Sequence, residues 1–196
     1  SEIESSVKYI RSLDSYYNSS KNLTLLQCTS MYPIPDSDAN LSVMNTLKSR
    51  LDVSIGYSDH TIGMSALEVA TALGATILEF HFTNNKDNTT FRDHKVSLDK
   101  IDTQLLCKKL DLITELVGSS VKVPTKTEIK SDHRVSFRRS IYAKKNIQKN
   151  EVITESHLTS LRPAINNESI KYDLLIGRKA SCNIEKNDPV LVSKTI

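Results

Sequence analysis

Three short apolar runs, each followed by a stretch with helical spacing, constrain the fold of this chain more than any other feature. The runs predict buried strands, because each is bounded by polar or turn-forming residues. The predicted strands are residues 23–28, 53–56 and 76–82. In the stretches that follow, apolar residues recur every three or four positions, as on one face of a helix. The predicted helices are residues 41–47, 65–73 and 99–116.

Alternating strands and helices predict an α/β fold with a parallel sheet that is buried on both faces. An open doubly wound sheet and a (β/α)₈ barrel both fit this pattern. In either arrangement, functional groups gather at the carboxyl ends of the strands. The apolar side of the last predicted helix is expected to be Ile101, Leu105, Leu112 and Leu116. The chain starts within helical spacing at Ser1, so we expect further residues before it.

Near Gly118 the sequence becomes polar and loses its helical spacing, which predicts a second module after it. Residues 118–137 are expected to form a linker, because their first half is polar and lacks helical spacing. Residues 1–117 then form one domain, and residues 138–196 form a small β-rich domain with short alternating runs between polar turns. Two of its segments, 143–152 and 180–190, resemble each other loosely, which we interpret as a weak internal repeat.

Charge and cysteine content exclude several classes of function. The formal net charge is only +3 and the basic residues are scattered, so neither nucleic acid nor an anionic membrane is an expected partner. The three cysteines, Cys28, Cys107 and Cys182, lie far apart, which favours reduced thiols over a disulfide framework. No apolar stretch reaches the ~18 to 20 residues that a membrane span needs. We therefore expect a cytoplasmic protein.

Two histidines beside carboxylates follow successive predicted strands. Alternate side chains of a strand face the same way, so Glu79 and His81 are expected to converge. His60 ends the preceding strand, and neighbouring strands lie only ~4.8 Å apart, so His60 and His81 are candidates to share one divalent cation. Manganese, iron, cobalt or zinc suits imidazole better than calcium or magnesium does. Asp59 and Glu79 are candidates to orient the two rings, and the alternative is that both histidines only cap strand ends.

Other polar residues near these strand ends are weaker candidates. Ser58 and Thr61 lie at a strand-to-helix junction, where phosphate is often held. Asp93 lies in the loop after the third strand, where function is common but a solvated charge is commoner. Cys28 is interpreted as a packing residue rather than a nucleophile. The chain contains no glycine-rich phosphate loop, GxSxG or HExxH sequence.

Several segments, in this order, resemble the N-acetylneuraminate (sialic acid) synthase family. They are residues 26–35 (LQCTSMYPIP), 56–61 (GYSDHT), 79–83 (EFHFT) and 93–98 (DHKVSL). The C-terminal module is similar to the antifreeze-like SAF domain of that family, which is β-clip-like. The resemblance there lies in residues 138–141 (RRSI), 161–163 (LRP) and 177–180 (GRKA).

The resemblance implies a (β/α)₈ TIM barrel of which the last three strands are present, followed by the SAF domain. The family reaction condenses phosphoenolpyruvate with an N-acylated mannosamine-type sugar to a nine-carbon α-keto acid and phosphate. By the same resemblance His60 and His81 bind a metal, most simply Mn²⁺, and Ser58 contacts the phosphate of phosphoenolpyruvate. Residues that match sugar-holding positions are Tyr32, Glu79 and Asp93, and Glu79 is also our candidate catalytic carboxylate. Arg162 matches an arginine that a partner subunit inserts in a domain-swapped homodimer.

Two positions depart from the family pattern, Ser30 where asparagine is frequent and Phe80 where lysine is usual. The family also carries a catalytic carboxylate and phosphate-binding lysines on earlier strands. We therefore expect these 196 residues alone to be inactive. Two other functions stay open at this point, another metal-dependent aldolase-like barrel and a noncatalytic sugar-binding or ice-binding module. The acceptor sugar is open as well: N-acetylmannosamine, its 6-phosphate or a diacetamido sugar.

Overall fold

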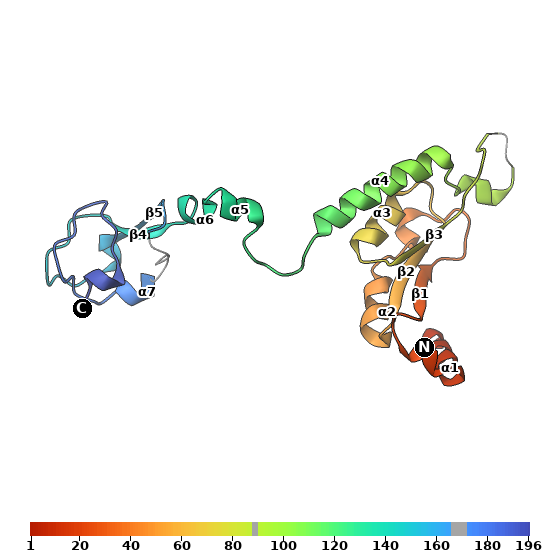
Figure 1. Ribbon diagram of the computed structural model, residues 1–196, viewed down its shortest axis with the longest axis horizontal. Coiled ribbons are helices and arrows are strands. Elements are labelled where there is room, and N and C mark those ends of the chain that lie inside the picture. The colour runs from red at the N-terminus through yellow and green to blue at the C-terminus, as the bar shows by residue number, and fades with distance from the viewer. Residues whose placement is uncertain (88–89, 166–171) are drawn as a thin grey trace. The chain divides into compact units, whose positions relative to one another are not determined.

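The computed structural model describes residues 1–87, 90–165 and 172–196 (Figure 1). Its contacts divide the chain into two compact units, Ser1–Ser120 and Val121–Ile196, which are described separately. In the described ranges, no helix combines the length and the apolar character that crossing a membrane requires.

The first unit is built on a parallel sheet of three strands in the order β1-β2-β3 (Figure 1). The strands are β1 (Thr24–Cys28), β2 (Ser54–Asp59) and β3 (Ile77–Phe80). The parallel α/β prediction is confirmed. The predicted end of the third strand at residue 82 is wrong, because the chain after Phe80 pairs with another segment: Leu98 N–H donates to the His81 carbonyl at 2.8 Å. His81 therefore lies just beyond the strand rather than in it.

In the described residues of this unit, four α-helices accompany the sheet. They are α1 (Glu2–Leu13), α2 (Val43–Leu51), α3 (Ser65–Ala72) and α4 (Lys100–Val117), with short 3₁₀ turns η1 (Ser15–Asn18), η2 (Asp36–Asp38) and η3 (Arg92–Lys95). Helix α4 begins where it does because Asp99 and Asp102 form a reciprocal capping box, which satisfies two amides at its start. Helices α3 and α4 pack against each other beside the sheet (Figure 1).

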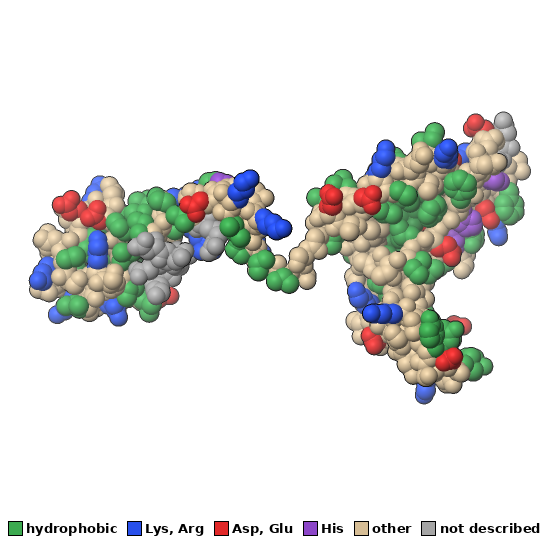
Figure 2. Space-filling view, in the orientation of Figure 1, with side chains coloured by type: hydrophobic (Ala, Val, Ile, Leu, Met, Phe, Trp, Pro, Cys, Tyr) green, Lys and Arg blue, Asp and Glu red, His purple; other side chains and the backbone are tan. Residues whose placement is uncertain are grey.

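The core of the first unit lies between the sheet and helices α2, α3 and α4. Its fully enclosed side chains include Met44, Ile55, Tyr57, Leu67 and Leu106. The predicted apolar side of α4 is wrong: Leu106 is the buried residue, whereas Ile101, Leu105, Leu112 and Leu116 are exposed. Helix α4 packs through the neighbouring stripe that carries Leu106 and Leu110. Hydrophobic side chains are accordingly visible on the surface of this unit (Figure 2).

The second unit contains a small antiparallel sheet. Its elements are α5 (Lys126–Lys130), α6 (His133–Ser136), β4 (Ser140–Ala143), η4 (Glu155–His157), β5 (Leu158–Leu161), α7 (Tyr172–Leu175) and η5 (Val192–Lys194). Strands β4 and β5 pair, and isolated bridges tie the remaining turns together. The predicted connection 118–137 contains two short helices, α5 and α6. Residues 166–171 of the predicted β-rich domain lie outside the described residues.

The two loosely similar segments of this unit lie against each other. Ile147 and Ile184 exchange both backbone hydrogen bonds, at 2.8 and 2.9 Å. The Asn146 side chain accepts from Lys186 N–H, and at the matching place Asn183 accepts from Lys149 N–H, both at 2.8 Å. The weak sequence repeat therefore corresponds to two turns that cap each other.

Candidate active site

His60 lies just beyond β2 and is oriented by the strand end beside it. Its side chain is buried, and Nδ1 lies 2.8 Å from the carbonyl oxygen of Thr29, which follows β1. A carbonyl oxygen only accepts hydrogen bonds, so Nδ1 carries the proton and donates. In the neutral ring Nε2 then keeps its lone pair, as a metal ligand requires. Cys28 Sγ lies 3.9 Å from the same nitrogen, Nδ1.

Tyr32 and His81 complete a cluster of three rings around His60, the ring cluster. The ring centres of Tyr32 and His60 are 4.0 Å apart, and those of Tyr32 and His81 are 5.4 Å apart. The two imidazole centres are also 5.4 Å apart. The loop that carries Tyr32 is fastened to the next strand end, because Ile34 N–H donates to the His60 carbonyl at 3.0 Å. The three strand ends thus bring together residues that are distant in sequence.

The two imidazoles have the donor chemistry and spacing for one divalent ion. A metal–nitrogen bond of about 2.0–2.1 Å places an ion about 3.2 Å from each ring centre, so rings 5.4 Å apart are able to share one. Within the described part of the chain, no three His, Cys, Asp or Glu side chains form a ready cluster for an ion. An ion at this pair would therefore need ligands in addition to these two side chains.

Ser58 and Glu79 form a polar pair beside the ring cluster. They are opposite each other in the register of β2 and β3, and Ser58 Oγ donates to Glu79 Oε1 at 2.7 Å. Ser58 is buried, whereas Glu79 is exposed. The carboxylate therefore has one oxygen held by the protein while the side chain stays open to solvent.

Asp59 does not orient His60, so that part of the prediction is wrong. Asp59 Oδ1 accepts from the Tyr57 hydroxyl at 3.1 Å and from Thr61 N–H at 2.8 Å. The reason is strand alternation, which puts Asp59 on the same face as Tyr57 and turns it away from its neighbours. The acceptor for the His60 ring is the Thr29 carbonyl instead.

The bond between Tyr57 and Asp59 predicts a pH-dependent stability. Burial first, and the Asp59 carboxylate second, raise the pKa of Tyr57 above its ordinary value of 10.0. The folded state thus favours the neutral phenol. The contribution of this phenol to the free energy of unfolding is complete below pH 10 and is lost as the pH rises above that value. We expect Tyr57→Phe to lower the free energy of unfolding by about 2 kcal/mol at pH 7. We also expect the loss to shrink at alkaline pH in urea titrations, and an equal loss at every pH would contradict this account.

Asp93 lies in η3, next to His81. Its Oδ2 is 3.8 Å from His81 Nδ1, and its Oδ1 is 3.4 Å from Arg92 Nε. Within the described residues, Asp93 Oδ1 is enclosed and makes no hydrogen bond. The neighbouring His94 contacts Thr83 Oγ1 at 3.0 Å and belongs to the hydrogen bonding of its own loop.

Arg92 was not singled out from the sequence. Its guanidinium carbon lies 5.0 Å from the centre of the Tyr32 ring. The sequence carries no local signal for this contact, because Tyr32 and Arg92 meet only through the arrangement of the strand ends.

Arg162 lies in the second unit, just after β5. Its side chain is exposed and its guanidinium carbon lies 5.5 Å from the Phe137 ring centre. The peptide bond from Arg162 to Pro163 is cis. Its predicted role at a partner's active site remains a prediction.

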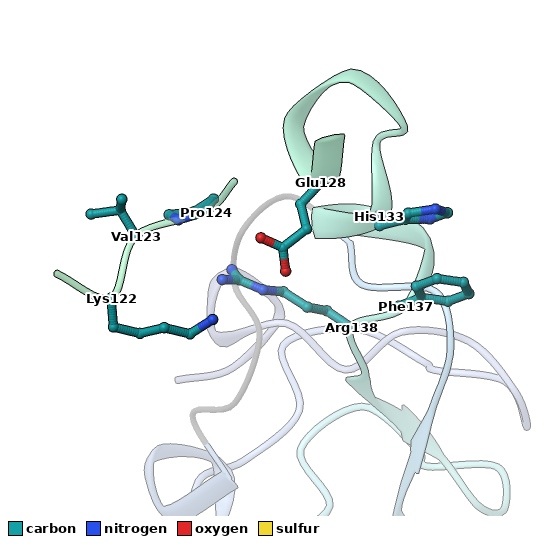
Figure 3. Close-up of a pocket in the computed structure, with 7 residues that line it drawn as sticks. All are labelled: Lys122, Val123, Pro124, Glu128, His133, Phe137 and Arg138. Atoms are coloured by element: carbon teal, nitrogen blue, oxygen red, sulfur yellow. The ribbon is translucent and has the colours of Figure 1, made fainter. Parts of the chain in front are cut away.

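A pocket in the second unit involves none of the predicted site residues (Figure 3). It is lined by Lys122, Val123, Pro124, Glu128, His133, Phe137 and Arg138. The Glu128 carboxylate points toward the ends of Lys122 and Arg138 in Figure 3. A hydrogen bond from Thr125 N–H, with Lys122 adding to it, lowers the pKa of Glu128. The single carboxylate of this pocket lies among two cationic side chains, Lys122 and Arg138, and we assign the pocket no function.

A parallel α/β unit followed by a small antiparallel β unit is the arrangement of barrel-type synthases with an appended SAF domain. The NeuB family model matches residues 1–122 and the SAF domain model matches residues 138–194. The chain belongs to the NeuB family.

Several curated relatives of the chain are sugar-acid synthases. An N,N'-diacetyllegionaminic acid synthase of Campylobacter jejuni is 38% identical over 86% of this chain and 49% of its own length. A pseudaminic acid synthase of the same species is 35% identical over 85% of this chain and 48% of its own. The chain thus spans about half the length of these curated relatives.

A solved structure supports the fold. The crystal structure of a spore coat polysaccharide biosynthesis protein E from Chromobacterium violaceum matches with a TM-score of 0.64. The match covers 97% of this chain and 56% of that protein, at 24% identity. At this identity the likeness concerns the fold alone.

Proposed function

We propose that this chain is part of a synthase that condenses phosphoenolpyruvate with an N-acylated mannosamine-type sugar. The enol carbon of phosphoenolpyruvate bonds to the aldehyde carbon of the open sugar, one water is consumed, and phosphate leaves as the nine-carbon α-keto acid forms. The observation that carries the proposal is the meeting of His60, His81 and Tyr32 at the ends of three parallel strands in a NeuB-family chain.

His60 and His81 are the proposed protein ligands of a divalent ion, most simply Mn²⁺. When bound, such an ion supplies Lewis-acid polarisation to the sugar aldehyde oxygen. The contribution of this chain is orientation. The Thr29 carbonyl fixes the His60 tautomer, and the packed Tyr32 ring limits the movement of both imidazoles.

The remaining polar residues are proposed to hold the two substrates. Tyr32, Glu79 and Asp93 are assigned to the sugar, whose hydroxyls donate well to carboxylates. Ser58 is assigned to the phosphate of phosphoenolpyruvate. Its hydroxyl proton already points to Glu79, so an entering substrate would exchange with that bond. This exchange would couple Glu79, the candidate catalytic carboxylate, to occupancy of the phosphate position.

Arg162 is proposed to act in a partner subunit of a domain-swapped homodimer, where it would close the site over the acyl sugar. Support comes from the match of the SAF domain model to residues 138–194, which include Arg162. The exposed position of its side chain leaves it able to reach another chain.

The test is phosphate release by the chain together with the residues encoded upstream of Ser1, here termed the extended protein. We expect phosphate release with Mn²⁺, phosphoenolpyruvate and one sugar from a panel of N-acetylmannosamine, its 6-phosphate and diacetamido sugars. The 196-residue chain alone is expected to release none. Turnover of an aldehyde without phosphoenolpyruvate would favour an aldolase-like enzyme. Sugar binding without turnover of any mixture would favour a noncatalytic module.

A further inference from the structure

Arg92 is a cation in contact with the ring cluster, and neither the family resemblance nor the proposed function gives it a role. Its guanidinium carbon lies 5.0 Å from the centre of Tyr32, whose ring packs on both imidazoles. It belongs to η3, the turn that also carries Asp93. A positive charge is therefore held beside the histidine pair, with Tyr32 between them.

The ion pair between Arg92 and Asp93 is loose. Arg92 Nε is 3.4 Å from Asp93 Oδ1, and that oxygen makes no hydrogen bond in the described part of the chain. The Arg92 side chain is 67% exposed. Exposed ion pairs of this kind contribute little to stability, so a change of partner costs little. The guanidinium thus remains available to a second anion.

We propose that Arg92 is a specificity-determining residue that binds an anionic group, a carboxylate or a phosphate, of a substrate at the histidine pair. This inference rests on the proposed function. The planar guanidinium offers five donors in a fork that matches two oxygens of such a group. Its contact with Tyr32 restricts the side chain beforehand, so less conformational entropy is lost on binding. The anion belongs either to phosphoenolpyruvate or to a 6-phosphorylated acceptor sugar.

The experiment compares Arg92→Met and Arg92→Lys in the extended protein. We expect Arg92→Met to raise KM for the anionic substrate about tenfold while kcat changes less than about twofold, because ground-state binding is lost. Arg92→Lys, which keeps the charge without the fork, should recover part of the loss. Lys100→Met, at an exposed cation that begins α4, is the matched control and should leave both constants unchanged.

Measuring KM for each substrate separately shows which substrate carries the anionic group that Arg92 binds. A higher KM for phosphoenolpyruvate alone assigns Arg92 to that substrate, and a higher KM for the 6-phosphorylated sugar but not its unphosphorylated form assigns it to the acceptor. An unchanged KM for every substrate overturns the proposal. So does a lower kcat with unchanged KM, since Arg92 would then act only by holding Tyr32.

A binding measurement keeps this inference separate from the proposed function. Calorimetric titration with phosphoenolpyruvate, and with inorganic phosphate as a simpler probe, does not need turnover. Weaker binding by Arg92→Met supports the role of Arg92 even if the extended protein shows no synthase activity. Equal affinity of the variant and the parent for both probes, with no change in KM, overturns it.

Discussion

Replacing His60 or His81 with alanine is expected to lower kcat of the extended protein by about 10³-fold or more. A Lewis acid contributes several kcal/mol to stabilising charge in a transition state, and about 4 kcal/mol corresponds to this factor. In the proposed site each imidazole supplies one of the two protein donors, so one alanine would leave a single donor for the ion. The measurements are phosphate release and Mn²⁺ affinity by calorimetry, and we expect both to fall together.

His94→Asn is the matched control for the two alanine variants. His94 lies in the same part of the unit, but its ring contacts Thr83 at 3.0 Å rather than the other imidazoles. We expect its loss to change Mn²⁺ affinity by less than about threefold, since its ring contacts Thr83 rather than either imidazole. Unchanged metal affinity in both His60→Ala and His81→Ala would refute the shared site. An equal fall in all three variants would point to general disruption of the fold.

The parallel sheet was predictable because buried strands leave a signal that is local in sequence. Each run of four to seven residues is mostly apolar and is bounded by polar or turn-forming residues, so its position follows from the pattern. The end of β3 was not predictable. It is set by hydrogen bonds from Leu98 to His81 and from Thr83 to Leu98, between residues far apart in the chain.

In helix α4, the spacing of apolar residues predicts the helix but not the side of it that packs. Its sequence carries two adjoining apolar stripes, one with Leu105 and Leu112 and one with Leu106 and Leu110. Spacing identifies both as helical, but only packing decides which of them faces the core. The Leu106 stripe does, and the other stays exposed in this chain.

The site was predictable only in part, and for a similar reason. The pairing of His60 with His81 followed from the general position of carboxyl strand ends in parallel sheets. The hydrogen-bond partner of the His60 ring was not predictable, because the Thr29 carbonyl is a backbone group and carries no residue-specific signal. Asp59 was assigned by its adjacency in sequence, yet adjacent residues on a strand face opposite ways.

Replacing Gly56 with alanine is expected to destabilise the first unit by about 3 kcal/mol, since overpacking a filled site forces the backbone to move. Gly56 lies in β2, the central strand, opposite Ile77 of β3. A Cβ added there would lie 2.4 Å from the Ile77 carbonyl oxygen and 2.4 Å from Leu26 Cδ2. Leu26 is a side chain that is able to rotate, but the Ile77 carbonyl is fixed in the sheet. The strands must therefore separate.

Gly74→Ala is the matched control for Gly56→Ala. Gly74 has a φ of +92°, and no atom lies within 4 Å of an added Cβ, so the cost is backbone strain alone, about 1 kcal/mol. Hydrogen exchange measured by mass spectrometry resolves the two units within one molecule. Gly56→Ala should speed exchange across β1, β2 and β3 and leave residues 121–196 unchanged, because the contacts divide there. If the strands exchanged as slowly in Gly56→Ala as in Gly74→Ala, the stability of the sheet would not depend on the close approach of β2 and β3 at Gly56. The separation of β2 and β3, which His60 and His81 follow, could then increase without loss of stability. The 5.4 Å between the two ring centres would not be fixed by the packing at Gly56.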